Sequence, residues 1–168
     1  MTMAMPEPDL YQPVPELCRA ADVLRGVSRQ FYQRQARLIA EYTLPNGRRA
    51  DAMVLESDGT LTIIEIKVSR ADLHGDSKWP DYLEYCDRFY WAVSPGLDAG
   101  ILEGATYLPG RVGVIVADRY GAEIIRDAVA HPLASARRKA EVVRIARVAM
   151  ARAMVLSDPE LIAIHAPG

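Results

Sequence analysis

One strand and the two turns before it constrain the fold of this chain most strongly. Residues 60–68 have the sequence TLTIIEIKV, which is apolar except for two threonines, Glu65 and Lys67. Side chains alternate between the two faces of a strand, so Glu65 and Lys67 share one face. Charged residues are seldom buried unless they are paired or used. The pattern therefore predicts a buried strand that carries a functional pair of charges.

Two turn sequences predict how this strand pairs with its predecessors. Residues 56–60 are ESDGT, which fits a three-residue hairpin loop with Gly59 in the left-handed conformation that such loops require. Residues 44–48 are LPNGR and have the same form, with proline at the first turn position and Gly47 at the last. The two turns together predict a three-stranded antiparallel meander.

The same turns place three carboxylates in one row across the meander. Asp51 is predicted to lie opposite Glu65, and Glu41 opposite Asp51, with Lys67 two residues further along the same face. A two-residue turn at 46–47 would instead move Glu41 to the other face, because a one-residue slip reverses every side chain. Glu41 is therefore predicted in the row under one turn assignment and outside it under the other.

A row of carboxylates predicts a bound cation. Like charges on adjacent strands destabilise a sheet unless something neutralises them. Carboxylate oxygens favour Mg²⁺ or Mn²⁺, and the three histidines and two cysteines are too scattered to form a soft-metal site. Such a metal polarises a phosphoryl oxygen, and Lys67 would orient water or stabilise the charge on phosphorus. The alternative is that these charges form surface pairs on an exposed sheet.

The rest of the pattern is consistent with one α/β domain built around the meander. With 168 residues, of which 50% are hydrophobic, the chain has room for one sizeable core. The further elements predicted are an amphipathic helix at 15–35, a helix beginning at Pro80, a strand at 89–93 parallel to the meander, strands at 111–118 and 122–126, and a long helix at 135–156. We expect a flexible segment at 1–14, the domain at 15–156 and a tail at 157–168.

Cationic residues near the predicted site suggest contacts with phosphate. Arg48 and Arg49 precede Asp51, and Lys78 begins the helix that should flank the site. A net charge of −2 argues against indiscriminate binding of polyanions. Arginines 137, 144 and 147 of the long helix fit either phosphate binding or simple solvation of a surface helix. Asp72, Asp76 and Asp81 fit either an extension of the metal shell or helix caps, and capping is the favoured role for Asp72 and Asp76.

Two motifs give the chain a family resemblance. The combination of RRAD at 48–51 with EIK at 65–67 resembles the PD-(D/E)xK nuclease pattern, although Ala50 stands where that pattern has proline. A longer run, EIKVSRADLHGDSKWPDYLEYCDRFYWAV followed by GVIVADRYGAEIIR, is similar to the bacterial MmcB family, whose members are proposed DNA-repair endonucleases. This resemblance covers about residues 16–152.

The resemblance implies a fold and a set of site residues. The fold would be a restriction-endonuclease-like core of helix, three-strand antiparallel meander, helix and strand, extended by extra strands and a long C-terminal helix. Asp51 and Glu65 would be metal ligands and Lys67 the catalytic lysine, with Glu41 as a further carboxylate for a second metal or for water. Lys78 and Tyr82 resemble a Q-x-x-x-Y motif of some superfamily members, with lysine in place of glutamine, and would contact substrate.

The leading hypothesis is Mg²⁺-dependent hydrolysis of phosphodiester bonds by an endonuclease that acts on DNA in repair. The alternatives are a catalytically silent module that binds DNA structures and a protein-interaction or oligomerisation domain. No apolar run is long enough to span a bilayer, so we expect a soluble, cytoplasmic protein. A second copy of the chain and other repair proteins are further candidate partners.

Overall fold

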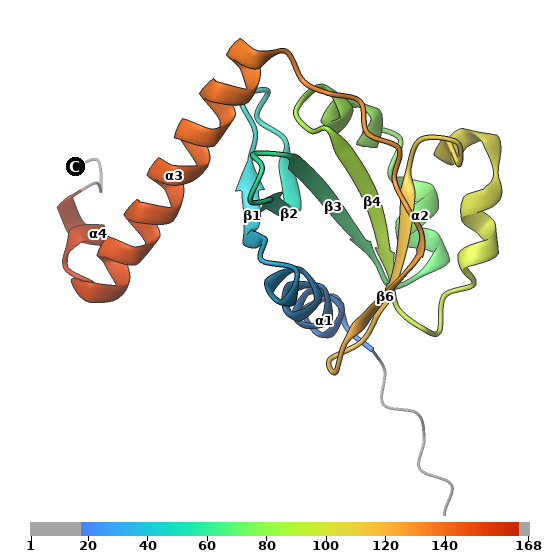
Figure 1. Cartoon of the computed structure of the whole chain (residues 1–168). Helices are drawn as coiled ribbons and strands as arrows, with labels where there is room; N and C mark the ends of the chain where they lie inside the picture. The colour runs from blue at the N-terminus through green and yellow to red at the C-terminus, as the bar shows by residue number, and fades with distance from the viewer. Residues whose placement is uncertain (1–17, 165–168) are drawn as a thin grey trace, which may run out of the picture.

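The computed structural model describes residues 18–164, which form a six-stranded mixed sheet with helices on both faces (Figure 1). The strands lie side by side in chain order, antiparallel from β1 to β3, parallel from β3 to β5, and antiparallel between β5 and β6. They are β1 (Arg37–Thr43), β2 (Arg49–Leu55), β3 (Leu61–Lys67), β4 (Arg88–Val93), β5 (Gly113–Ala117) and β6 (Ala122–Arg126).

The predicted meander and both of its turns are confirmed. Gly47 and Gly59 have φ angles of +80° and +86°, the left-handed conformation that glycine adopts without a steric penalty. The Leu44 N–H donates to the Arg48 carbonyl at 2.7 Å, and the Glu56 N–H donates to the Thr60 carbonyl at 2.9 Å, which closes two three-residue loops. These loops set the register on which the predicted carboxylate row depends.

The helices agree with the sequence in order and differ in length and type. They are α1 (Ala20–Gln33), α2 (Arg70–Gly75), α3 (Ser135–Ser157) and α4 (Leu161–Ile164), with 3₁₀ helices η1 (Trp79–Glu84), η2 (Ala99–Glu103) and η3 (Ala105–Tyr107). The helix predicted from Pro80 is the 3₁₀ turn η1, and α4 lies where only a tail was predicted. The predicted flexible segment at 1–14 falls outside the described residues.

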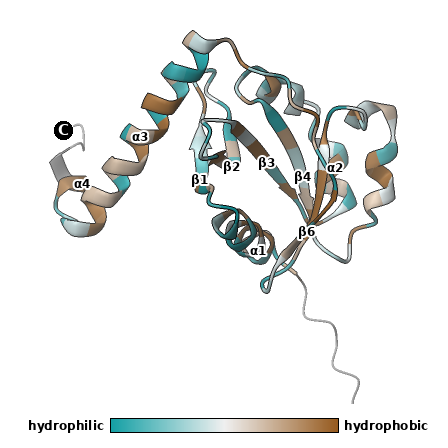
Figure 2. Ribbon diagram, viewed as in Figure 1, coloured by the Kyte–Doolittle hydropathy of each residue, from teal (hydrophilic) through white to brown (hydrophobic). Residues whose placement is uncertain are grey.

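Each face of the sheet has its own hydrophobic layer. On one face, α1 buries Val23, Val27 and Phe31 against β2 to β5. On the other, an aromatic cluster that includes Trp79 and Trp91, with ring centroids 5.4 Å apart, covers β3 and β4. All seven residues of β3 are buried, since both of its faces are covered. Figure 2 shows hydrophobic residues along the central strands β3 and β4.

The helix α3 is attached to the sheet by arginines. Its Arg138 forms two hydrogen bonds of 2.7 Å with Asp87, which also accepts the N–H groups of Leu61 at 2.8 Å and Leu133 at 2.7 Å. Asp87 is 4% exposed. Further along the helix, Arg152 donates to carbonyl oxygens of the edge strand β1. These bonds occupy backbone groups of an edge strand that another chain could otherwise pair with.

Among residues 18–164, no helix combines the length and apolar composition that crossing a lipid bilayer requires.

Candidate functional site

At one end of the β2–β3 pair, two side-chain carboxylates replace backbone carbonyls as hydrogen-bond acceptors. The last paired residues are Ala52 and Ile64, and the next opposed pair is Asp51 and Glu65, as predicted. Beyond that point, the Asp51 N–H donates to Glu65 Oε1 at 3.1 Å, and the Ile66 N–H donates to Asp51 Oδ2 at 2.8 Å. Each carboxylate is therefore held in place by a backbone N–H of the opposite strand.

Burial makes this carboxylate pair electrostatically unfavourable. Glu65 is 4% exposed. Burial, followed by the nearby charge of Asp51, raises the pKa of Glu65 to about 8. Burial also raises the pKa of Asp51, against the Ile66 hydrogen bond and the Lys67 charge, which lower it. A cation beside the two groups would favour their ionised forms.

Lys67 lies beside the pair but is engaged elsewhere. Its Nζ is 2.9 Å from Asp76 Oδ2 and 3.8 Å from Asp72 Oδ1, and 5.7 Å from the centroid of the Trp91 ring. Burial alone would lower the pKa of Lys67, but the hydrogen bond and charge of Asp76, with the charge of Asp72, raise it overall. The ammonium is thus kept charged chiefly by Asp76, with smaller contributions from Asp72 and Glu65.

Glu41 has the predicted register but not the predicted side-chain position. Ala40 pairs with Ala52 and Tyr42 with Ala50, so Glu41 is opposite Asp51. Its φ angle is +49°, which is strained for a residue other than glycine. The Glu41 side chain is 68% exposed, and its carboxylate lies 3.7 Å from Arg49 Nη1. The structure therefore brings together two carboxylates of the predicted three.

The remaining donor set suits a hard cation that needs few protein ligands. Asp51 Oδ1 and Glu65 Oε2 accept no hydrogen bond from residues 18–164. Within those residues, no three or more His, Cys, Asp or Glu side chains are arranged to hold a metal. Mg²⁺ usually keeps several waters and takes one or two protein carboxylates, whereas Zn²⁺ and Ca²⁺ need more protein ligands. Two carboxylates with one open oxygen each therefore fit Mg²⁺ or Mn²⁺.

Sequence comparison places the chain in a family. The family model described as DNA repair protein MmcB-like matches residues 12–160. The chain belongs to the MmcB-like family. A solved structure, a protein of unknown function from Silicibacter pomeroyi, matches this MmcB-like chain with a TM-score of 0.77 and 39% sequence identity, covering 84% of this chain and 92% of that chain. A search of the curated proteins found no match.

Membership confirms the predicted MmcB resemblance and points to a role in DNA repair.

The predicted substrate residues of this MmcB-like chain lie in different environments. Arg48 donates to Asp81 Oδ2 at 2.7 Å, so its charge is already paired. Tyr82 is buried, donates its hydroxyl to the Arg49 carbonyl at 3.0 Å, and has its pKa raised by burial. Tyr82 therefore supports β2 next to Asp51. Lys78 is exposed, and so is the Arg49 side chain, at 63%.

Two acids for which capping was the favoured role lie beside Lys67, and one of them, Asp76, is also the C-cap residue of α2. Asp76 and Asp72 flank Lys67, whereas the N-cap of α2 is Ser69, which accepts the Asp72 N–H at 3.2 Å. The sequence signal was available: two acids follow a strand that ends on a buried lysine, and a buried ammonium needs a partner.

The arginines of α3 mostly serve the fold. Arg137 donates to the Glu84 carbonyl at 2.9 Å, and Arg144 donates to the Thr43 carbonyl at 3.4 Å. Among the arginines considered for phosphate binding on this helix, Arg147 has no hydrogen bond or ion pair with the described residues. The solvation and anchoring interpretation of this helix is therefore better supported than a row of phosphate contacts.

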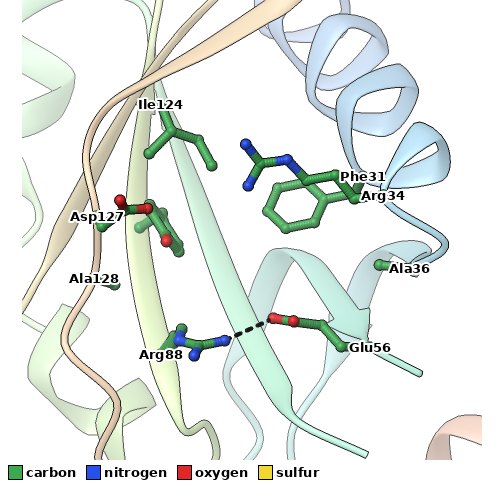
Figure 3. Close-up of a pocket in the computed structure, with 9 residues that line it drawn as sticks. Phe31, Arg34, Ala36, Glu56, Arg88, Ile124, Asp127 and Ala128 are labelled. Carbon is green, nitrogen blue, oxygen red and sulfur yellow. Dashed lines mark hydrogen bonds and ion pairs between the residues drawn. The ribbon is translucent and has the colours of Figure 1, made fainter. Parts of the chain in front are cut away.

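A cavity of about 290 Å³ lies on the α1 face of the sheet, away from the carboxylate pair (Figure 3). Arg34 and Asp127 point into it, and Arg88 and Glu56 form an ion pair of 3.2 Å at its edge. None of the predicted site residues lines this cavity.

Proposed function

We propose that this protein is a Mg²⁺- or Mn²⁺-dependent deoxyribonuclease of the PD-(D/E)xK type that acts in DNA repair. The observation that carries the proposal is the adjacent pair of Glu65, which is buried, and Asp51, which is half-buried. Backbone N–H groups hold both carboxylates, and no cationic side chain of the described residues forms an ion pair with either. The order of helix α1, the β1 to β3 meander, α2 and β4 supports a restriction-endonuclease-like core.

The residues of the pair would have defined roles. Asp51 Oδ1 and Glu65 Oε2 would hold the cation, while their other oxygens keep the hydrogen bonds that orient them. When bound, the cation would polarise a phosphoryl oxygen and activate water. Lys67 would place its ammonium beside the phosphate and stabilise the charge that develops on phosphorus.

Exposed cations near the site would hold the DNA backbone. Arg49 lies two residues before Asp51, and its exposed guanidinium is 3.7 Å from the Glu41 carboxylate, a weak surface pair that phosphate can displace. Lys78 immediately precedes η1, donates its N–H to Asp76 Oδ1 and is also exposed. Contacts of this kind position DNA without selecting a sequence.

The second candidate is a DNA-binding module without catalysis. The observation that favours it is the third carboxylate: Glu41 faces solvent, so the described residues offer the cation two side-chain ligands. An interaction or oligomerisation domain is the third candidate.

Cleavage of labelled single-stranded, duplex, flap and branched DNA, with Mg²⁺, Mn²⁺ or EDTA, distinguishes these candidates. We expect metal-dependent cleavage that Asp51→Asn reduces on the order of a hundredfold or more. Glu41→Gln is the matched control, because it removes a carboxylate charge from the same register row outside the pair. If wild-type protein binds one DNA structure, cuts none of them and binds equally as Asp51→Asn, the binding module becomes the better account.

A further inference from the structure

Four carboxylates lie near Lys67, those of Asp51, Glu65, Asp72 and Asp76, and the ammonium forms its shortest ion pair with Asp76. Glu65 lies two residues before Lys67 on the same face of β3, a separation of about 6.6 Å along the strand that a lysine side chain can span. An ammonium beside a buried carboxylate pair would ordinarily neutralise it. Within the described chain, however, Lys67 Nζ lies within 4 Å of Asp76 and Asp72 and of no oxygen of Asp51 or Glu65.

Backbone hydrogen bonds fix Asp76 in a position where its carboxylate accepts the Lys67 ammonium. It directly follows α2, and its N–H donates to the Leu73 carbonyl at 3.4 Å, which ties it to a residue that is 1% exposed. Its Oδ1 accepts the Lys78 N–H at 3.3 Å, which leaves Oδ2 directed to Lys67. The Asp76 side chain is 17% exposed, so its attraction for the ammonium is weakly screened by solvent.

Asp72 offers a natural comparison within the same segment. It also carries one negative charge near Lys67, but its Oδ1 is 3.8 Å away and its side chain is 47% exposed. Solvent-exposed ion pairs of this geometry contribute little. The centroid of the Trp91 ring lies 5.7 Å from Nζ, a distance at which a cation–π contact further favours this position of the ammonium.

We propose that Asp76 is a positioning residue that holds the Lys67 ammonium away from Asp51 and Glu65 and so leaves that pair open to a cation. The inference rests on the proposed function, in which the pair holds a metal and Lys67 assists. Without Asp76, the ammonium turns to the carboxylate pair, neutralises it internally and competes with the metal. Asp76 thereby controls cation affinity without contacting the cation.

The test is a cycle of variants in which Mn²⁺ affinity is measured by calorimetric titration, with no DNA present. We expect Asp76→Asn to weaken Mn²⁺ binding about tenfold, equivalent to about 1.4 kcal/mol. Asp72→Asn removes the same charge from the same segment and is expected to weaken binding by less than about threefold. Asp76→Glu is expected to restore part of the affinity, because it returns the acceptor.

The decisive comparison adds Lys67→Met to each protein. If Asp76 acts through Lys67, then Asp76→Asn changes Mn²⁺ affinity by less than about twofold once the ammonium is gone. An equal loss with and without Lys67 would overturn the inference, as would unchanged affinity in the wild-type background or the absence of Mn²⁺ binding by wild-type protein. Coupling in this cycle, together with no DNA cleavage by wild-type protein, would uphold the inference and refute the nuclease proposal.

Discussion

Two carboxylates of this protein are equally buried and have opposite surroundings. Asp87 and Glu65 are each 4% exposed. Asp87 accepts two backbone N–H groups and a bidentate arginine, so its charge is fully compensated. Glu65 accepts one N–H, on one oxygen, and lies beside a second carboxylate. Asp87 therefore stabilises the fold, whereas Glu65 has no ion pair with the described residues.

Comparing Asp87 with Glu65 indicates when a buried charge signals function. The buried ion pair of Asp87 with Arg138 has a structural role, because its hydrogen bonds hold β3, β4 and α3 together. A buried carboxylate next to another one costs stability, and such costs persist where they serve a ligand. The exposed fraction does not distinguish Asp87 from Glu65, but their hydrogen-bond and charge partners do.

The largest effect is expected at the compensated carboxylate. Replacing Arg138 with methionine leaves Asp87 buried without its cation, and we expect a loss of about 3 kcal/mol in the free energy of unfolding, measured by urea denaturation. Arg137→Met is the matched control, because the neighbouring arginine pairs with Glu84 at the surface. That control should change stability by less than about 0.5 kcal/mol. Equal losses of stability from the two substitutions would show that the pair of Asp87 with Arg138 contributes no more than a surface ion pair.

The opposite sign is expected at Glu65. Its pKa is raised from 4.5 to about 8, so between those values the unfolded chain has lost a proton that the folded chain keeps. Stability without divalent cations therefore falls as pH rises through this window. Glu65→Gln removes the penalty, and we expect it to add about 2 kcal/mol at pH 8 and almost nothing at pH 4. Urea denaturation at both pH values measures this.

Asp87→Asn is the companion of that variant and should destabilise the protein at pH 8. Loss of stability in both variants would show that Glu65 is compensated as well as Asp87 is.

The smallest effect is expected at Glu41. Its side chain is 68% exposed and its carboxylate lies 3.7 Å from Arg49 Nη1, so Glu41→Gln should change Mn²⁺ affinity by less than about twofold. Titration of Mn²⁺ into the variant and into wild-type protein measures the difference. A loss as large as that of Asp51→Asn would return Glu41 to the site.

Local chemistry allowed the meander to be predicted, because each turn depends on a glycine within the turn itself. Gly47 and Gly59 set the loops, the loops set the register, and the register brings Asp51 to Glu65. The strand β4 and its parallel pairing also followed from a short apolar run after a helix. These steps involve residues close in sequence.

The remaining features depend on contacts between residues distant in sequence, and for this reason they could not be predicted. The Glu41 side chain leaves the row at a residue with a left-handed backbone, and Arg152, 111 positions later, binds the Glu41 carbonyl at 2.9 Å. The bond between Asp87 and Arg138 likewise joins residues 51 positions apart. Neither pair is marked by a local pattern. The ion pair of Asp76 with Lys67 was not predicted for another reason, since an acid after a helix is equally consistent with capping, and Asp76 is indeed the C-cap residue of α2.

The most direct test of the account is whether the Asp51 and Glu65 pair binds a divalent cation. Calorimetric titration of Mn²⁺ into wild-type protein, Asp51→Asn and Glu65→Gln, without DNA, measures this. We expect one saturable site in wild-type protein and binding weakened at least about tenfold in each variant. Wild-type protein that binds no Mn²⁺, or variants that bind it as tightly as wild type, would show that Asp51 and Glu65 do not form a cation site.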